Sequence, residues 1–511
     1  MTKQQTTKAL SEPIREVPRD NSDIVIIGNG VAGITAALEV RRLAPEKHVA
    51  VITDQSHPTI YTPALKQFAI GKIEREQLLV HPAGTEHAHH IYMMNARVAE
   101  IKTRENCLYL NNGQTFGYGS LLLATGSSPV GLASSLPGSH FDGILTLHRL
   151  SDYLNLRHRL HEVKEAVVIG GGLLAMETVM VLLKQHVRVH WLIRSEIFLP
   201  HMLDYEASSI VIDDCRRAGA WVQTGVEVVG IVGKVGAVAG IMTNHGQFLP
   251  CQLVIACTGS QPVTTLATHC DVPLEEMNGF LVNSYLHTNV ENIFAAGDCA
   301  LFENTQTGEY QSSMQWHSAL LQGRIAAAVM TEQDTIPSMG VAWHKTQIGS
   351  LPMLSVGSPL NAPKGTTYLT NRNKRKYRRL AFYDNRLIGY LALGGRQPDS
   401  FALKQLIDEG HSIRGIEKEL LMGDFHDHRY FFHIRQQAQQ RRMPTEKLRA
   451  IHPSSVKKVS RVTEARITAI SIVQTSKKID IYDKIVDDTG PKKEIDENVL
   501  QPTLESKDNE K

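Results

Sequence analysis

Two glycine-rich segments of the sequence have the residue types and spacing of turns that bind dinucleotides. The first, GNGVAG, follows the apolar run IVII, opens an apolar helix, and supplies Gly28, Gly30 and Gly33. Gly28 permits the tight turn, Gly30 lets a pyrophosphate approach the backbone, and Gly33 allows the helix to pack closely on the strand. The helix N-terminus then offers free amide groups to phosphate oxygens. We therefore predict a dinucleotide site at residues 28–33.

A second segment, GGGLLAME, repeats this plan after the β-branched run AVVI. It supplies Gly170, Gly172 and Ala175, and alanine is tolerated in the third position of this fingerprint. A glycine run that serves only the packing of a helix is the alternative interpretation. The repetition predicts two nucleotide-binding units in one chain.

The ends of the second strands indicate which dinucleotide each unit binds. In VAVITD, Thr53 stands where an acid is expected to bond a ribose hydroxyl, and Asp54 follows one position later. Asp54 is therefore a candidate cofactor-binding residue, with a solvated turn residue as the alternative. In HVRVHWLIRS, Ile193 takes the place of a NAD-selecting carboxylate, and Arg194 beside it could pair with a 2′-phosphate. We therefore favour NADPH over NADH.

The composition of the 511-residue chain disfavours several classes of partner. A formal charge of +2 favours neither nucleic acid nor anionic lipid, and the polar N-terminus has no apolar run for a signal peptide. The sequence has no uninterrupted run of about 20 apolar residues, so we expect a cytoplasmic protein. The six cysteines form no CxxC pair, and the histidine-rich HPAGTEHAHH matches no closed ligand set. We expect incidental thiols and no metal site.

Hydrophobic periodicity indicates the elements that must position these residues. A short apolar run precedes each glycine turn and helical periodicity follows it, which predicts two strand–turn–helix–strand units. From about residue 340, the short alternating strands YRRLAFYD and NRLIGYLALG precede a helix at FALKQLIDEG, which indicates an α+β region. The last stretch, DDTGPKKEIDENVLQPTLESKDNEK, has too little apolar surface to offset its ordering entropy. We expect it to be a mobile tail.

Three further motifs, LLLATGSSP, LVIACTGSQP and NIFAAGDCA, occur in a recognisable order. Through them, residues 23–331 resemble the pyridine nucleotide-disulfide oxidoreductase superfamily of two-dinucleotide flavoproteins. Residues 341–410 resemble the third domain of the rubredoxin-, ferredoxin- and nitrite-reductase-type reductases, which use FAD and NAD(P)H. The resemblance implies an α/β fold with two Rossmann-like domains, for FAD and NAD(P), and a smaller C-terminal α+β domain. The implied divisions are a flexible N-terminus (1–22), the FAD-binding domain (23–148 and 262–335), the NAD(P)-binding domain (149–261), the C-terminal domain (336–434) and a polar tail (435–511).

The resemblance also assigns cofactor-binding roles to residues of these motifs. Ala124, Thr125 and Gly126 would form the crossing between the FAD and NAD(P) domains. Asp298 of AAGDCA would bond the ribitol of the flavin, with a turn residue as the alternative. Two further glycines are assigned to cofactor binding: Gly259 and Gly297.

Three residues would lie close to the reacting rings if the resemblance holds. The helix after GDCA would direct its N-terminus at the flavin pyrimidine, where its dipole stabilises reduced flavin, and Gln315 is a candidate contact there. Glu177 matches a family glutamate near the nicotinamide, and Lys66 follows the loop that holds a flavin-side lysine. We expect an ion pair between Lys66 and Glu177 with a catalytic role, and two solvated charges are the alternative.

One absence separates this chain from the thiol enzymes that it resembles. Disulfide reductases carry paired cysteines after the first helix, and peroxide or coenzyme A disulfide reductases carry one. Here IYTPAL and its surroundings contain none. Because a thiolate is needed to relay electrons to a disulfide, we expect hydride transfer from nicotinamide to flavin and electrons that leave directly from the flavin.

The expected acceptor is a ferredoxin- or rubredoxin-like carrier, or a small-molecule electron acceptor. One alternative is a quinone reductase similar to type II NADH dehydrogenases, which dock on membranes through C-terminal helices. The tail segment KKVSRVTEARITAISIVQTSKK is basic but lacks a wide apolar helical stripe, so membrane association is less favoured. The other alternative is a flavin-binding redox sensor. The sequence does not decide whether the chain forms a homodimer.

Overall fold

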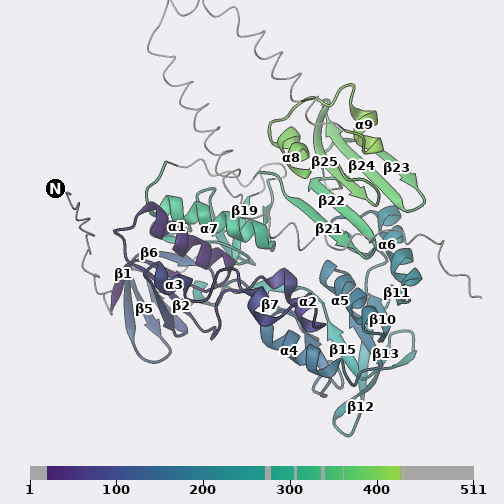
Figure 1. Ribbon diagram of the computed structural model, residues 1–511, viewed down its shortest axis with the longest axis horizontal. Helices are drawn as coiled ribbons and strands as arrows, with labels where there is room; N and C mark the ends of the chain where they lie inside the picture. Colours follow the sequence, from purple (N-terminus) through teal and green to yellow (C-terminus); the bar gives the residue numbers. More distant parts are fainter. Residues whose placement is uncertain are drawn as a thin grey trace, which may run out of the picture. The chain divides into compact units, whose positions relative to one another are not determined.

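The computed structural model of the chain describes residues 20–270, 278–303, 308–334, 340–360, 362–425 and 430. All of these except residue 430 belong to one compact unit. In this unit a mostly parallel sheet, a fully parallel sheet and an antiparallel sheet hold the principal strands (Figure 1). Nearly all of the expected flexible N-terminus and the whole expected tail lie outside the described residues.

The first sheet contains the first predicted strand–turn–helix–strand unit. Its central strand β1 (Asn21–Ile27) pairs in parallel with β2 on one side and β6 on the other. Residues 24–27 are buried, which explains why the run IVII is apolar without alternation. The strand order is β3-β2-β1-β6-β5-β4, and β18 adds to β6. The other strands are β2 (Val49–Thr53), β3 (Ile91–Asn95), β4 (Val98–Lys102), β5 (Cys107–Leu110), β6 (Thr115–Leu123) and β18 (Ile293–Ala295).

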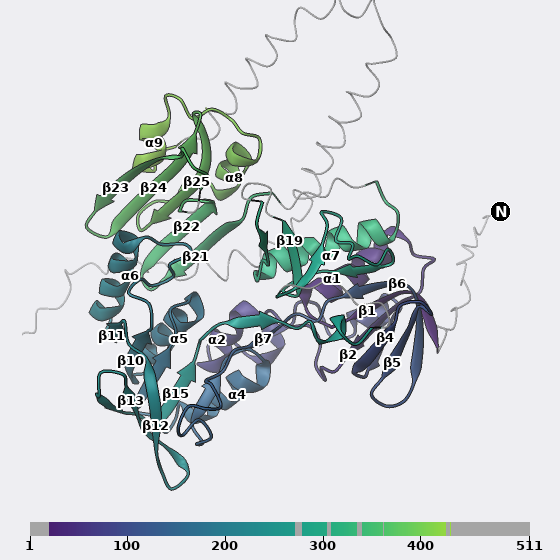
Figure 2. The same cartoon turned by 180° about the vertical axis from the view of Figure 1, so that it is seen from behind.

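Helices α1 (Val31–Leu43) and α7 (Trp316–Met330) lie side by side against this sheet, as both views show (Figures 1 and 2). Their close approach requires Gly323, because a Cβ there would come 2.4 Å from the carbonyl oxygen of Ala32. A segment far along the chain thus packs on the first sheet. Short elements of this domain are β17 (Phe280–Val282), β19 (Ala300–Glu303), β20 (Tyr310–Gln311) and α3 (Thr85–Ala88).

The second sheet is parallel throughout, in the order β11-β10-β9-β15-β8. It contains the second predicted unit, in which β9 (Glu165–Ile169) leads into α5 (Leu173–Lys184) and then β10 (Arg188–Ile193). A small antiparallel sheet, β12-β13-β14, follows. The remaining elements are α4 (Leu150–Arg159), α6 (Tyr205–Arg217), β11 (Trp221–Thr224), β12 (Val228–Lys234), β13 (Ala237–Thr243), β14 (Phe248–Pro250) and β15 (Leu253–Ala256).

The chain passes between the two sheets at a pair of short antiparallel strands, β7 (Ser127–Pro129) and β16 (Ser260–Pro262). Strand β8 (Ile144–Thr146) already pairs with β15 in the second sheet. The first crossing therefore lies at β7, earlier than residue 148, where the sequence suggested the boundary. A strand of three residues is too short to show periodicity, which explains the difference.

The C-terminal domain is a five-stranded antiparallel sheet in the order β21-β22-β25-β24-β23. The two strands predicted from the sequence form the hairpin β24 (Lys376–Tyr383) and β25 (Arg386–Leu393). Its turn residues Asp384 and Asn385 both have positive φ, a conformation that Asp and Asn adopt more readily than most residues. The other elements are β21 (Trp343–Ile348), β22 (Leu351–Gly357), β23 (Thr367–Asn373), α8 (Ser400–Asp408) and α9 (Glu417–Met422).

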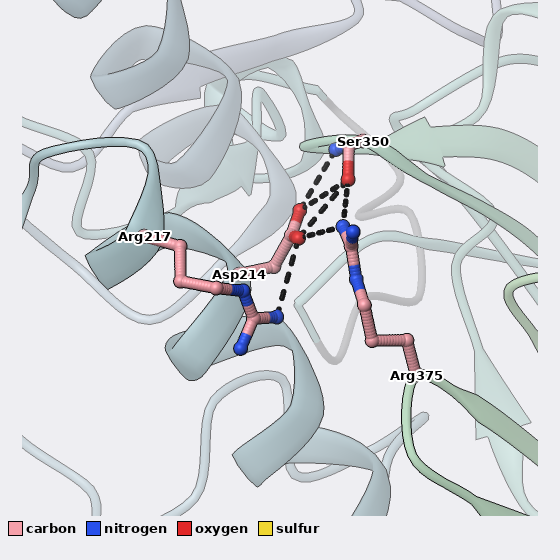
Figure 3. Close-up of polar contacts among 4 residues, drawn as sticks. All are labelled: Asp214, Arg217, Ser350 and Arg375. Carbon is pink, nitrogen blue, oxygen red and sulfur yellow. Dashed lines mark hydrogen bonds and ion pairs between the residues drawn. The ribbon is translucent and has the colours of Figure 1, made fainter.

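A buried carboxylate on α6 joins this domain to the domain of the second sheet (Figure 3). Asp214 is 5% exposed and accepts hydrogen bonds from the backbone amide of Ser350 at 2.9 Å and from its hydroxyl. Arg375, from the turn between β23 and β24, forms an ion pair with the same carboxylate, and Arg217 donates to it at 3.4 Å. We call Asp214, Arg217, Ser350 and Arg375 the Asp214 cluster.

Helix α6 has a second polar contact with the C-terminal domain at its N-terminus. Asp204 caps the helix by accepting from the amide of Ala207 at 2.9 Å. The same carboxylate accepts from Tyr377 and pairs with Arg379 at 3.1 Å. Two separate carboxylates therefore hold the C-terminal sheet on α6.

No helix in the described part of the chain has the length and apolar character that a membrane span requires. Within the same residues, no group of three or more His, Cys, Asp or Glu side chains has a metal-binding arrangement. The tail segment weighed for membrane docking lies outside the described residues.

Candidate active site

The first glycine turn has no room for a side chain at two of its three glycines. Gly28 has a φ of +112°, and a Cβ there would come 2.2 Å from the carbonyl oxygen of Ala124 at the end of β6. A Cβ on Gly33 would come 2.0 Å from the carbonyl oxygen of Gly28. The tight turn and the close packing of α1 both require glycine here.

Gly30 is different, because a Cβ built on it would meet no atom within 4 Å. It is the N-cap of α1, whose first amide groups are not used within the helix. Open space in front of a helix N-terminus is what a bound pyrophosphate needs. The residues present at this turn therefore fit the pyrophosphate of FAD.

The second turn repeats this geometry. Gly170 has a φ of +139°, and a Cβ there would come 2.1 Å from the carbonyl oxygen of Cys257. Gly172 is the N-cap of α5, and a Cβ on it would meet no atom within 4 Å. Ala175 is fully buried in the first turn of the helix. The second turn thus has the same open position for a dinucleotide as the first.

Asp54 and Arg194 each follow directly on the second strand of their unit. Asp54 is exposed, one residue after the buried Thr53. Ile193 is fully buried at the end of β10, and its apolar side chain has no group that could bond a ribose hydroxyl. The side chain of Arg194 is 85% exposed, and its Nε lies 3.9 Å from the carboxylate of Glu227. Both candidate residues are accessible at the expected strand ends, and their roles stay predictions.

Two threonine hydroxyls connect the crossing segments. The Thr125 hydroxyl donates to the carbonyl oxygen of Val263 at 2.6 Å, and the Thr258 hydroxyl donates to that of Val130. These bonds join each sheet to the segment that enters or leaves the other, so they tie the two crossing segments together. Each threonine precedes a glycine with positive φ: Gly126 (+71°) and Gly259 (+116°).

Asp298 lies beside this crossing, where its carboxylate accepts a hydrogen bond from the Ser127 hydroxyl at 2.8 Å. Burial raises the pKa of Asp298, while Ser127 and the charge of His148 lower it in part. Gly297 has a φ of +86°, and its amide donates to the buried amide oxygen of Gln322 on α7 at 2.7 Å. The turn before β19 is thereby fixed on α7, with a hydrogen-bond acceptor that suits a sugar hydroxyl.

The ion pair expected between Lys66 and Glu177 is present. Lys66 belongs to the short helix α2 (Leu65–Ala69), and its Nζ donates to Oε2 of Glu177 on α5. The two side chains are 19% and 27% exposed, so solvent screens the pair only in part. The pair joins the segment after the first nucleotide unit to the first helix of the second unit. It therefore lies where the two dinucleotide domains meet.

The N-terminus of α7 contacts two other parts of the chain. Gln315 is its N-cap residue, and its Nε2 lies 2.6 Å from Nε2 of His344 on β21. Trp316 packs edge-on against Tyr61, with ring centroids 4.9 Å apart. Tyr61 precedes the helix of Lys66, with the 3-10 turn η1 (Thr62–Ala64) between them. The lysine segment, α7 and the C-terminal domain therefore come together at one place.

All six cysteines are free thiols. Burial raises the pKa of Cys215, Cys251 and Cys257 to about 12, and it raises the pKa of Cys299 as well. Such thiols are poor nucleophiles at neutral pH. The first cysteine of the sequence is Cys107, on β5, so none occurs in the segment of Lys66. The active site has no thiol relay in that segment.

Several residues of this region were not expected from the sequence. Thr258 has a usable signal, because CTG at 257–259 repeats ATG at 124–126. Ser127, Tyr61 and His344 have none, because each acts through a partner that is distant in sequence.

Comparisons with known proteins agree with this geometry. Residues 22–323 match the family described as pyridine nucleotide-disulphide oxidoreductase. A rubredoxin-NAD(+) reductase of Pseudomonas putida is 26% identical over 314 residues, which cover 61% of this chain and 80% of the relative. A putidaredoxin reductase of the same organism is 28% identical over 316 residues, covering 61% and 74%.

A solved structure supports the fold as well. A ferredoxin reductase of Rhodopseudomonas palustris is 26% identical and superposes with a TM-score of 0.67, covering 73% of this chain and 91% of that chain. The α/β fold with two dinucleotide-binding domains, predicted from the sequence, is confirmed.

Proposed function

The chain belongs to the pyridine nucleotide-disulphide oxidoreductase family, and from that premise we propose that it uses FAD and NAD(P)H to reduce a small electron-carrier protein. It is an oxidoreductase, and each of its two glycine turns has an open pyrophosphate position. The choice of a carrier protein as acceptor rests on the segment of Lys66, because related thiol enzymes hold reactive cysteines in the corresponding segment and this chain has none there. Relatives named for rubredoxin, putidaredoxin and ferredoxin support this choice.

The residues of the site act by binding and orientation. The two glycine turns would hold the pyrophosphates, and Asp298 would accept a hydrogen bond from the flavin ribitol. Lys66 and Glu177 fix each other between the domains. With both dinucleotides bound, Lys66 would lie on the flavin side and Glu177 on the nicotinamide side. Bound FAD supplies a hydride acceptor that can release its electrons singly.

An aromatic series leads from the N-terminus of α7 to the surface. The ring centroids of His317 and Trp343 are 5.6 Å apart, and those of Trp343 and Phe401 are 5.4 Å apart. Phe401 is 55% exposed. Because aromatic side chains are enriched at protein interfaces, we infer that the carrier approaches this face of the C-terminal domain.

The proposal is tested by reducing the enzyme anaerobically with NADPH or NADH and mixing it with a ferredoxin, a rubredoxin and a soluble quinone. We expect rapid reoxidation of the enzyme by one of the two carrier proteins. Indifference to both carriers, combined with fast reaction of the quinone, would replace this proposal by the quinone alternative.

We also propose that Arg194 gives a preference for NADPH, since its exposed guanidinium follows β10 where a 2′-phosphate would lie. Replacing Arg194 by alanine removes one charge-assisted contact, so the KM for NADPH should rise about tenfold while that for NADH stays unchanged. Arg188→Ala, at the other end of β10 and 74% exposed, is the matched control. A wild-type enzyme that prefers NADH would contradict this assignment.

The cytoplasmic location, the membrane association and the homodimer that the sequence raised stay predictions. Oxidation of NAD(P)H by the flavin-loaded protein also separates the enzyme from a redox sensor, for which turnover would be negligible.

A further inference from the structure

His344 has an unusual position for a residue of the C-terminal domain. It lies on β21, a strand that packs against α5, the helix that carries Glu177. Its ring also contacts Gln315, the N-cap of α7 in the first domain, with 2.6 Å between the two Nε2 atoms. One side chain therefore connects the C-terminal domain to the end of α7, next to the region where the two dinucleotide domains meet.

The chemistry of this contact fixes the roles of both groups. An amide nitrogen can only donate, so the His344 Nε2 atom is the acceptor and carries no proton. Burial lowers the pKa of His344 to about 4, which keeps the ring neutral near pH 7 and keeps this acceptor available. The bond in turn restrains the Gln315 side chain and uses only one of its two amide hydrogens.

The neighbours of Gln315 determine where its side chain lies. The residue precedes Trp316, whose ring packs on Tyr61 in the segment that leads to Lys66. Helix α7 is itself fixed on α1 by the close contact at Gly323 and on the turn of Asp298 through Gln322. Helix α7 is thus placed by three contacts, of which the Trp316–Tyr61 contact is at its N-terminus, and its cap residue contacts the C-terminal domain.

We propose that His344 is a positioning residue for the flavin: through its hydrogen bond it orients Gln315, and thereby couples the placement of the C-terminal domain to the binding and the redox potential of FAD. This inference rests on the proposed function in one respect, because it takes FAD as the group that the N-terminus of α7 faces. It goes further in assigning a cofactor-tuning role to a residue of a domain outside the two nucleotide units.

The test is a double-mutant cycle on the full-length holoenzyme with His344→Ala, Gln315→Ala and the double variant. The readouts are the FAD dissociation constant, from the flavin fluorescence released on dilution, and the midpoint potential of the bound flavin. Loss of one hydrogen bond should weaken FAD binding about fivefold in each single variant. The double variant should bind FAD no more weakly than the single variants, because both substitutions remove the same hydrogen bond. The midpoint potential should become more negative in all three variants. In each of them the Gln315 amide, which would stabilise reduced flavin, is displaced or removed.

Two further variants keep the test decisive. His344→Gln retains an acceptor and should recover most of the wild-type affinity and potential, whereas a purely structural role for the ring would leave this variant as impaired as His344→Ala. Lys345→Ala, at the exposed neighbouring position on β21, should match the wild type. Multiplicative effects of the two single variants, or an unchanged midpoint potential, would overturn the inference.

The two proposals fail in different ways. A wild-type protein that binds FAD but is reduced by neither nicotinamide would contradict the proposed function, and the cycle on FAD affinity would still be measurable. If the wild type is active and His344→Ala changes neither the FAD affinity nor the midpoint potential, the proposed function stands and only the role of His344 is refuted.

Discussion

Gly28 and Gly30 lie in the same turn, and an added methyl group should impair a different property at each: folding at Gly28 and FAD binding at Gly30. At Gly28 a Cβ would come 2.2 Å from a carbonyl oxygen, whereas at Gly30 it would meet no protein atom within 4 Å. Gly30→Ala should therefore leave the thermal stability of the FAD-free protein unchanged, yet weaken FAD binding at least about tenfold because the methyl group fills the pyrophosphate position. Gly28→Ala should destabilise the FAD-free protein itself.

The second turn supplies the matched control for this comparison. Gly172→Ala should raise the KM for the nicotinamide nucleotide and leave FAD affinity unaltered, because Gly172 holds the equivalent open position in the other domain. Calorimetric melting and FAD titration separate the two effects. Equal loss of FAD affinity in the Gly30 and Gly172 variants would refute the assignment of one cofactor to each turn.

Lys66 and Glu177 form an ion pair that was expected from the sequence and is present in the structure. Replacing Lys66 by methionine keeps the length of the side chain and removes its charge. We expect the rate of anaerobic flavin reduction by NAD(P)H to fall about tenfold, since the partner carboxylate loses its fixed position, with FAD content retained. Stopped-flow absorbance of the flavin measures this rate. Lys66→Arg should retain most of it, and a rate unchanged in Lys66→Met would remove the pair from the mechanism.

Which of these residues could be predicted from the sequence depended on how local their partners are. Gly28 and Gly170 were predictable because their constraint comes from the strand–turn–helix pattern itself. His344 was not, because nothing in the alternating strand around it indicates a partner at the cap of α7. Thr258 lies between these cases, since its motif repeats within the chain.

At the scale of elements, α6 holds the C-terminal domain through the Asp214 cluster and through Asp204. Burial by itself would raise the pKa of Asp214, but the hydrogen bonds from Ser350 and the charge of Arg375 outweigh it and hold the pKa below its usual range. A carboxyl group whose pKa is lower in the folded state stabilises the fold above its unfolded pKa of about 3.9. This stabilisation is lost as the pH falls through the folded pKa.

Asp214→Asn should therefore lower the free energy of unfolding by about 2 kcal/mol at pH 7, because a buried ion pair loses its charge. The difference from the wild type should shrink toward zero as the pH falls through the lowered pKa of the wild-type Asp214 carboxyl, because that carboxyl then becomes protonated as well. Urea unfolding at several pH values measures this. Asp213→Asn, on the exposed side of the same helix, should change little. An Asp214→Asn deficit that does not vary with pH would contradict the electrostatic origin.

The longer elements could be predicted from the hydrophobic periodicity of the sequence. Both strand–turn–helix–strand units, the hairpin of β24 and β25 and the helix α8 lie where the apolar pattern predicts them. The three-residue strand β8 did not follow, and this moved the domain boundary to β7. The pairing of α6 with the C-terminal sheet could not be predicted either, because Asp214 and Ser350 are far apart in the chain and neither lies in a motif.

At the scale of the whole molecule, three domains converge on one site. The first contributes its glycine turn and α7, the second contributes Glu177, and the third contributes His344 and the aromatic surface of Trp343 and Phe401. The motifs predicted the first two contributions, since nucleotide binding imposes the same backbone geometry on every chain that uses it. The third depends on the surface that we propose for the acceptor, and such surfaces have no fixed sequence pattern.

The central claim is that electrons pass from NAD(P)H through the flavin to a carrier protein without a thiol. Its most direct test is the rate at which the enzyme reduces a two-iron, two-sulfur ferredoxin with NADPH or NADH, before and after its accessible thiols are alkylated with N-ethylmaleimide. We predict that the ferredoxin is reduced and that alkylation leaves the rate unchanged. Loss of ferredoxin reduction on alkylation, or reduction of a disulfide substrate in place of the carrier, would contradict the claim.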